Sequence, residues 1–239
     1  MKRPTDRRFP RLREFIKGRD EEEKIRKILK PIGRDLNILD VGCGFGRKYQ
    51  LLESLGFTRT LGVDINPDMV RVNVDEGRNV VTPEEFHRSY HDSKFDLVLM
   101  SHVIEHFQWN ELLPFLETYL NHLEDNGYLL VISPVLHSLF FNDFDHVKPY
   151  LPGSIRSLFG AMEQVQVKPR HRLELMDLRF RRAPLSLAFC RSLYVDSVNK
   201  VPICFNLALT VLFRISFKAI GKTTGWIGLF RKLETQVGD

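Results

Sequence analysis

The sequence predicts an α/β protein with a doubly wound, Rossmann-like, mostly parallel sheet. Short apolar runs alternate with helical segments from residue 37 onward, and a glycine-rich loop follows the first run. Two later runs, 95–100 and 128–133, are apolar at nearly every position, which is typical of strands covered by helices on both faces. Strands that alternate with helices at this spacing indicate parallel pairing.

The composition narrows the class of protein further. The 239 residues, 43% hydrophobic and 27% charged, suffice to bury a core and exclude a disordered or collagenous chain. The three cysteines, Cys43, Cys190 and Cys204, form no C-x-x-C pair, which argues against a disulfide framework and a cysteine-based zinc site. The N-terminus is too charged for a secretory signal, so we expect a cytoplasmic location.

Charge is divided along the chain. Residues 1–34 carry 13 Lys/Arg and 6 acids, and residues 151–239 carry 14 and 6, whereas residues 35–150 carry 8 and 18. Basic flanks suit a phosphate, a membrane surface or an acidic substrate, although scattered solvated charge explains them equally well. The acidic middle argues against a continuous nucleic-acid surface, so nucleic acid is not an expected partner.

The first elements follow from caps and periodicity. After a basic arm, residues 1–19, a charged helix is predicted for 20–30 and ends at Pro31 and Gly33. The elements expected next are a strand at 37–41, a helix at 47–55, a strand at 59–64, a helix capped by Asn66 with Pro67 in its first turn, and a short strand at 79–81.

The next helix begins with a capping box formed by Thr82 and Glu85. The elements expected after it are a strand at 95–100, a helix at 110–123 closed by the Asn126-Gly127 turn, a strand at 128–133, a short helix at 154–160, a strand at 164–168, apolar segments at 184–198 and 202–220, and a strand at 226–233.

The strongest chemical signal is the loop Asp40-Val41-Gly42-Cys43-Gly44-Phe45-Gly46. Glycine adopts positive φ and lets a ligand lie against bare backbone, and ligands of open α/β sheets bind at the carboxyl ends of strands. The G-x-G-x-G spacing differs from that of dinucleotide folds, and Asp40 suits a cationic ligand better than a phosphate. Asp64 ends the second strand, where a carboxylate accepts both hydroxyls of a ribose, and Ile65 is placed to contact an adenine.

These residues resemble a known family. The segments ILDVGCGFGR (38–47), LGVDIN (61–66) and FDLVLMSHVIEHF (95–107) are similar to class I S-adenosylmethionine-dependent methyltransferases, in particular to the small-molecule subset with a V-I-E-H segment after strand four. The segment FNDFDHVKPY (141–150) is also similar to a stretch that follows strand five in that subset.

The resemblance implies S-adenosyl-L-methionine as the cofactor. The methionine moiety would lie against Asp40 and the glycine loop, the ribose would bind Asp64, and Thr82-Pro83-Glu84 would take the place of the usual adenine contact. The complete set of expected cofactor-binding residues is Asp40, Gly42, Cys43, Gly44, Gly46, Asp64, Ile65 and Ser101.

The resemblance also implies a seven-stranded sheet with an antiparallel last strand, in which 164–168 and 226–233 are strands six and seven. The expected parts of the chain are a basic arm and helix (1–35), an S-adenosylmethionine-binding core (36–170), an apolar helical insertion (171–225), and a last strand with a tail (226–239).

Methyl transfer from a sulfonium mainly requires alignment of the acceptor, with a base only where the acceptor proton is hard to lose. His106 is the first candidate for a base or an acceptor-orienting residue, because imidazole titrates near neutral pH, and His146 is the second. Capping of the next helix and ordinary loop hydrogen bonds are the competing explanations. No metal is expected, because His102 and His106 lack an H-E-x-x-H pattern and a third ligand.

Residues 202–220 are apolar, with polar side chains at every fourth position: Asn206, Thr210, Arg214, Lys218 and, just beyond, Lys222. The segment is too interrupted to span a bilayer. Three placements stay open, namely burial against the sheet or a subunit partner, a lid over an apolar acceptor pocket, and a position in a membrane interface.

The expected function is methyl transfer from S-adenosyl-L-methionine to a small-molecule acceptor, with an apolar or lipid-linked acceptor left open. The alternatives are an RNA or tRNA methyltransferase, disfavoured because no N-P-P-Y motif occurs, a non-catalytic cofactor-binding regulatory subunit, and a nicotinamide dehydrogenase, disfavoured by the glycine spacing. Membrane contact through 202–222 and a homodimer also stay open.

Overall fold

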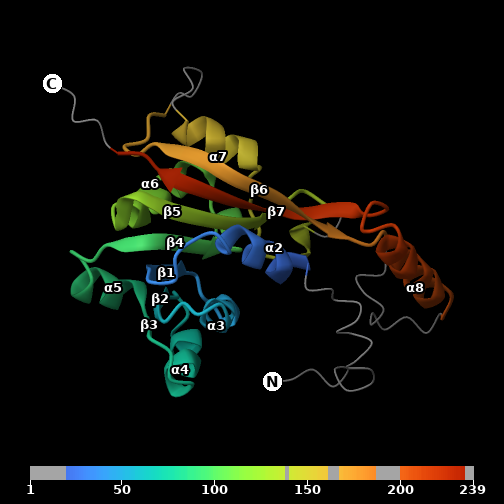
Figure 1. Cartoon of the computed structure of the whole chain (residues 1–239), viewed down its shortest axis with the longest axis horizontal. Helices are drawn as coiled ribbons and strands as arrows, with labels where there is room; N and C mark the ends of the chain where they lie inside the picture. Colours follow the sequence, from blue (N-terminus) through green and yellow to red (C-terminus); the bar gives the residue numbers. More distant parts are fainter. Residues whose placement is uncertain (1–19, 138–139, 161–166, 187–199, 235–239) are drawn as a thin grey trace.

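Seven strands and seven α-helices are formed by the residues that the computed structural model describes, 20–137, 140–160, 167–186 and 200–234 (Figure 1). The strands are β1 (Asn37–Val41), β2 (Arg59–Val63), β3 (Val80–Val81), β4 (Phe95–Ser101), β5 (Leu123–Pro134), β6 (Leu173–Ala183) and β7 (Lys222–Lys232). The helices are α2 (Asp20–Leu29), α3 (Arg47–Ser54), α4 (Pro67–Asp75), α5 (Pro83–Ser89), α6 (Trp109–Leu120), α7 (Pro152–Phe159) and α8 (Lys200–Ile215), with 3-10 turns η2 (Ile104–His106) and η3 (Phe140–Asn142).

The strands form one sheet in the order β3-β2-β1-β4-β5-β7-β6. Strands β1 to β5 are parallel, and β7 is antiparallel to both of its neighbours. This confirms the predicted doubly wound, seven-stranded sheet with an antiparallel last strand. The chain order reverses at β1, so the loop after β1 lies at the switch point where such sheets bind their ligands.

Alternate residues of the central strands pack into two separate apolar layers. Ile38 and Leu97 pack against α2 and α3 on one face, whereas Leu39 and Val98 pack against α5, α6 and α7 on the other. Helices α2 and α3 lie in front of the sheet in Figure 1. The sheet is therefore covered on both sides, which is why its central strands are continuous apolar runs.

The predicted helix caps are formed except for one half of the capping box. Asn66 caps α4, and Thr82 Oγ1 accepts a hydrogen bond from the backbone N–H of Glu85, 3.2 Å away. A capping box also requires the Glu85 carboxylate to accept a hydrogen bond from the backbone N–H of Thr82. This part of the prediction is wrong, because the carboxylate instead accepts hydrogen bonds from Arg88 and Ser89 within the same helix.

The predicted helix at 110–123 ends earlier, at Leu120. The carbonyl of His122 accepts a hydrogen bond from Phe95 N–H at 2.8 Å, which joins this part of the chain to β4. Strand β5 consequently begins five residues before the predicted range 128–133.

The sixth strand is not at 164–168. Residues 164–166 lie outside the described part of the chain, and Val167 and Lys168 form no strand. Strand β6 lies instead within 171–225, the range predicted to be a helical insertion. It is an edge strand with only β7 beside it, and most of its side chains are partly or fully exposed. It therefore lacks the apolar pattern by which the inner strands were predicted.

Two further expectations lie outside the described residues, the arm at 1–19 and most of the apolar segment 184–198. The predicted last strand, 226–233, is confirmed as β7.

Helix α8 presents its apolar side outward. Asn206 and Thr210 are only 5% and 4% exposed, whereas the stripe formed by Leu207, Val211 and Ile215 is exposed. In Figure 1 the helix lies beyond the ends of β6 and β7, away from the helices that cover the sheet. The apolar stripe is therefore not buried against the rest of the described chain. Burial against a subunit partner, a lid over an acceptor pocket and a position in a membrane interface stay predictions. Among these residues no helix combines the length and apolarity needed to cross a membrane.

The segment 143–150 is fixed to the core by its ends. The backbone N–H groups of Val147 and Lys148 both donate to the carbonyl of Glu105, at 2.8 and 3.2 Å. At the end of the segment, the indole Nε1 of the fully buried Trp226 donates to the carbonyl of Tyr150 at 2.8 Å. Strand β7 thus holds a segment that carries one of the candidate catalytic histidines.

We expect Trp226→Phe to lower the free energy of unfolding by about 2–3 kcal/mol, because it leaves a cavity and removes the hydrogen bond to Tyr150. Urea unfolding measures this. The matched control is Trp109→Phe, whose indole is exposed and whose loss should change stability by no more than about 0.5 kcal/mol. Equal effects of the two substitutions would show that Trp226 does not hold the segment.

Candidate active site

The glycine loop lies at the carboxyl edge of the sheet with positive φ at all three glycines, 71°, 53° and 69° at Gly42, Gly44 and Gly46. A Cβ atom on Gly42 would lie 2.5 Å from Val103, and one on Gly46 would lie 2.2 Å from Asn73. A Cβ on Gly44 would meet nothing within 4 Å. Packing therefore requires the two outer glycines, while the middle one presents bare backbone to open space.

Asp64 holds this loop in place. Its Oδ2 accepts a hydrogen bond from Gly44 N–H at 2.7 Å, and its Oδ1 accepts one from Asn66 N–H at 2.9 Å. The side-chain amide of Asn73 donates to the carbonyl of Gly44 at 2.7 Å, so the backbone groups on both sides of Gly44 are fixed. The predicted contact of Asp64 with a ribose stays a prediction, for which each carboxylate oxygen retains a lone pair.

Asp40 is a fully buried carboxylate below the loop. Within the described residues neither of its oxygens has a hydrogen-bond partner. Burial raises the pKa of Asp40 to about 7, with the negative charge of Asp64 adding to the shift and Lys48 opposing it. A buried charge without partners is costly, so this carboxylate is suited to a cationic ligand group.

A cleft of about 1340 Å³ opens above the loop, between α2, the end of β4 and β6. The predicted cofactor residues that line it are Gly42, Cys43, Gly44 and Ser101. Those outside its lining are Asp40, Gly46, Asp64 and Ile65, the last of which is 84% exposed. Burial raises the pKa of the Cys43 thiol, which therefore stays protonated and is no nucleophile.

Helix α2 is fixed over the cleft by a largely buried ion network. Glu21 pairs with Lys48 of α3 and with Arg181 of β6. Burial opposes the charge on Glu21, but a hydrogen bond with His102 and the positive charges of Lys48 and Arg181 hold the pKa of its carboxyl well below its usual range. Three segments distant in sequence thereby close one side of the cleft.

His102 connects this network to the next layer of the site. It adopts a left-handed backbone with φ 60°, and its N–H donates to the carbonyl of Ile132 at 2.8 Å. Its Nε2 is 3.0 Å from Nη1 of Arg181, and its Nδ1 is 3.0 Å from Oε1 of Glu105. Because a carboxylate only accepts, Nδ1–H donates to Glu105. Nε2 also lies 3.6 Å from Oε2 of Glu21. Although burial opposes the charged ring, hydrogen bonds to Glu105 and Glu21 raise the pKa of His102.

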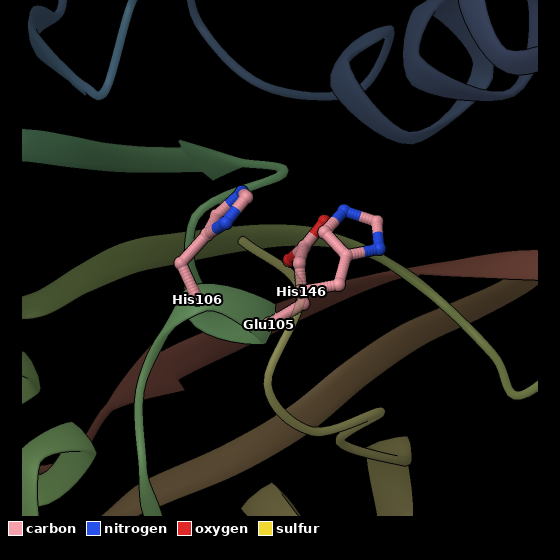
Figure 2. A group of neighbouring side chains, drawn as sticks. All are labelled: Glu105, His106 and His146. Carbon is pink, nitrogen blue, oxygen red and sulfur yellow. The ribbon is translucent and has the colours of Figure 1, made fainter. Parts of the chain in front are cut away.

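A second cavity, of about 500 Å³, adjoins the cleft. The residues that line both are His102, His137, Asp143 and Arg181. Both predicted catalytic residues, His106 and His146, line the second cavity, with ring centroids 5.1 Å apart in an edge-to-face arrangement. Figure 2 shows the two rings on either side of Glu105. The structure thus brings both histidines to one chamber beside the cofactor cleft.

Sequence reasoning missed four residues that line or close the site: Glu21, His102, His137 and Arg181. The run of four acids that begins α2 is a signal that could have suggested a charged contact. Its partner Arg181 lies 160 residues away on the mispredicted strand, so the pair could not be found from the sequence.

The fold and the site together define an α/β protein with a glycine loop at the switch point of its sheet, a cleft above that loop and a second cavity beside the cleft. Residues 7–181 match the family described as "Methyltransferase domain". The chain belongs to this family and is an S-adenosylmethionine-dependent methyltransferase of class I. The residues present fit the cofactor, because Gly44 offers open backbone and Asp40 offers an unpartnered carboxylate.

The chain is also similar to individual proteins. A stretch of 129 residues, 51% of the chain, is 32% identical to an uncharacterized protein of Methanocaldococcus jannaschii and spans only 54% of that protein. Among solved structures, the chain is similar to a SAM-dependent methyltransferase from Archaeoglobus fulgidus, with 23% identity, coverage of 92% and 97% of the two chains, and a TM-score of 0.56.

The N-methyltransferase NodS from Bradyrhizobium japonicum is also similar, with 14% identity, coverage of 90% and 96%, and a TM-score of 0.55. A second NodS structure contains S-adenosyl-L-homocysteine. At these identities the solved structures establish the fold.

Because the folded carboxyl of Asp40 ionises near pH 7 and the unfolded one near 4, the folded protein binds more protons between these values. The free energy of unfolding therefore falls as pH rises from about 4 to 7. We expect Asp40→Asn to gain stability over the wild type across this range, by on the order of 3 kcal/mol. Urea titrations of the cofactor-free proteins at pH 5 and pH 8 measure the difference, and a difference independent of pH would contradict the prediction.

Gly44→Ala and Gly56→Ala form a matched pair, since both positions have positive φ and open space around the Cβ. Each substitution should cost about 1–2 kcal/mol of stability. Only Gly44→Ala should weaken binding of S-adenosyl-L-homocysteine, by roughly tenfold or more, because the added methyl group occupies the ligand side of the loop. Isothermal titration calorimetry decides this, and equal affinity in both variants would remove Gly44 from the site.

Proposed function

We propose that this methyltransferase acts on a small-molecule acceptor that is apolar or lipid-linked, and that α8 contacts the lipid surface holding it. The single observation that carries the proposal is the orientation of α8, whose apolar stripe of Leu207, Val211 and Ile215 is exposed while Asn206 and Thr210 are buried. Phe217 extends the exposed apolar surface into the turn after the helix. An amphipathic helix of this kind is typical of proteins that lie in a membrane interface.

The charge around α8 favours an anionic lipid surface over a second copy of the chain. Residues 197–233 contain no acidic residue and six basic ones. Three of these, Arg214, Lys218 and Lys222, lie between the last turn of α8 and the first residue of β7. Lys218 is paired with Asp20 and Glu23 of α2, so its charge is partly balanced within the chain. Basic residues beside an exposed apolar stripe add electrostatic attraction to anionic lipids.

The chain's own residues divide the work of the reaction. Bound S-adenosylmethionine would supply an activated methyl group on a sulfonium. The glycine loop and Asp40 would hold the cofactor's methionine moiety, and the Asp64 carboxylate would hold its ribose. His106 and His146 would lie beside the acceptor in the adjoining chamber and orient it. The ion network of Glu21 would exclude water from one side of the cleft.

The test is a transfer assay with labelled S-adenosylmethionine and a fractionated lipid extract, alongside flotation with anionic vesicles. The label should enter the lipid phase. The variant Val211→Ser/Ile215→Ser removes two apolar side chains that each contribute about 1 kcal/mol or more, so it should lower vesicle affinity at least about tenfold. Its affinity for S-adenosyl-L-homocysteine should equal that of the wild type.

The matched control is Val74→Ser, which changes an exposed valine on α4. It should leave vesicle binding and labelling unchanged. Label confined to water-soluble acceptors, equal vesicle binding by all three proteins, or dimerisation that the α8 variant abolishes would each overturn the lipid-surface proposal.

A further inference from the structure

At the wall of the second cavity, His106 and His146 meet the buried Glu105, which lies behind the lining, in a cluster of side chains of the kinds that bind metals. Glu105, His106 and His146 each offer one ligand atom, and the three atoms lie within 4.8 Å of one another (Figure 2). The first two belong to η2, and the third belongs to the segment 143–150. The sequence showed only the pair His102 and His106, whereas the tertiary fold forms a different set by bringing His146 to Glu105 and His106.

Both histidines make a hydrogen bond that fixes the tautomer. Nδ1 of His106 is 3.1 Å from the carbonyl oxygen of Asp145, and Nδ1 of His146 is 2.8 Å from the carbonyl oxygen of Phe140. A carbonyl only accepts, so Nδ1 carries the hydrogen and Nε2 keeps its lone pair on each neutral ring. Metal-ligating histidines are typically oriented by such a bond from the second ring nitrogen.

Hydrogen bonds hold both the side chain and the backbone carbonyl of Glu105 in place. Its side chain is fully buried, its Oε1 accepts from His102 Nδ1 at 3.0 Å, and its Oε2 accepts from Ser133 Oγ at 3.2 Å. Its carbonyl binds Val147 and Lys148, which positions His146 beside it. A carboxylate accepts about four hydrogen bonds, so each oxygen keeps a lone pair after these contacts.

The three ligand atoms must move slightly closer together to bind one ion. Bonds of about 2.1 Å place neighbouring ligand atoms of a tetrahedral site about 3.4 Å apart, so the widest pair must approach by about 1.4 Å. The His106 side chain is about a third exposed and has room to move. Asp143 lines the same cavity with its Oδ2 3.9 Å from Nε2 of His146, and Arg181, a cation in that lining, is paired with Glu21.

We propose that Glu105, His106 and His146 bind a divalent transition-metal ion of the Zn²⁺ type on the acceptor side of the active site. Two imidazoles and one carboxylate suit Zn²⁺, Mn²⁺ or Fe²⁺ better than Mg²⁺, which prefers oxygen ligands. Three protein ligands leave open positions, as in catalytic rather than structural metal sites.

The consequence for catalysis rests on the proposed function. A divalent ion at this place lowers the pKa of a hydroxyl group bound to it, which favours an oxygen acceptor. The hydroxyl releases its proton to water and its oxygen forms the bond to the methyl carbon. The carbon–sulfur bond breaks with its electron pair left on sulfur, which yields neutral S-adenosyl-L-homocysteine.

The test measures metal binding without reference to activity. The full chain is stripped with a chelator and titrated with Zn²⁺ against a chromophoric indicator, and Co²⁺ serves as a spectroscopic probe of nitrogen ligation. We expect one equivalent bound, without competition from an equal concentration of Mg²⁺. His106→Gln and His146→Gln should each weaken binding roughly 10–100-fold. The matched control is His91→Gln, an exposed histidine that should have no effect.

Thermal unfolding of the metal-free variants identifies any that fails to fold, and the more exposed His106 provides the second variant if His146→Gln does. Binding well below one equivalent, or equal binding by the wild type and both variants, would overturn the proposal. An equal loss in His91→Gln would do the same. Binding of S-adenosyl-L-homocysteine by the stripped protein is measured in parallel. Methyl transfer without a metal would contradict only this inference. Metal binding without methyl transfer would contradict only the proposed function.

Discussion

The acceptor side of the active site depends on the burial of one residue, Glu105. Its carboxylate joins the end of β4, through His102, to the end of β5, through Ser133. Its carbonyl receives two backbone hydrogen bonds from the segment 143–150, which is also joined to this turn by the contact of His106 with the carbonyl of Asp145. A buried carboxylate must have its hydrogen bonds satisfied, and this requirement ties the turn after β4 to the end of β5. The backbone carbonyl of the same residue adds the segment 143–150. The meeting of His106 and His146 is a consequence of that arrangement.

Two carboxylates of the site, those of Asp40 and Glu105, are fully buried, and they differ in whether they have hydrogen-bond partners. Glu105 has a partner on each oxygen, whereas Asp40 has none among the described residues. The first contributes to a rigid scaffold. The second raises the energy of the cofactor-free protein, which is the usual sign of a group placed for a ligand rather than for stability. We infer that the fold gives up stability below the glycine loop in order to hold a cationic part of the cofactor there.

The C-terminal region combines a charged edge strand with an apolar helix that faces outward. Strand β6 contributes Arg181 to the network over the cleft, so the edge of the sheet belongs to the site. Helix α8 is the next described element after β6, and its polar side chains Asn206 and Thr210 face inward. Within the part of the chain that the structure describes, the helix thus packs with its polar stripe inward, the reverse of the usual arrangement of a surface helix. Its outward apolar stripe therefore supports a role at a surface outside the chain.

The sequence by itself determined the class of fold, the central strands, the glycine loop and the helix caps, because each depends on local periodicity or on residues a few positions apart. It also singled out His106 and His146, which the structure places in the lining of one cavity. The tertiary structure alone decided that Asp64 holds the loop through Gly44, that Glu21 meets Arg181, and that Glu105 unites the two histidines. These contacts join residues 20 to 160 positions apart, and an edge strand such as β6 carries no apolar signature. Their formation depends on how the layers pack, which no local pattern records.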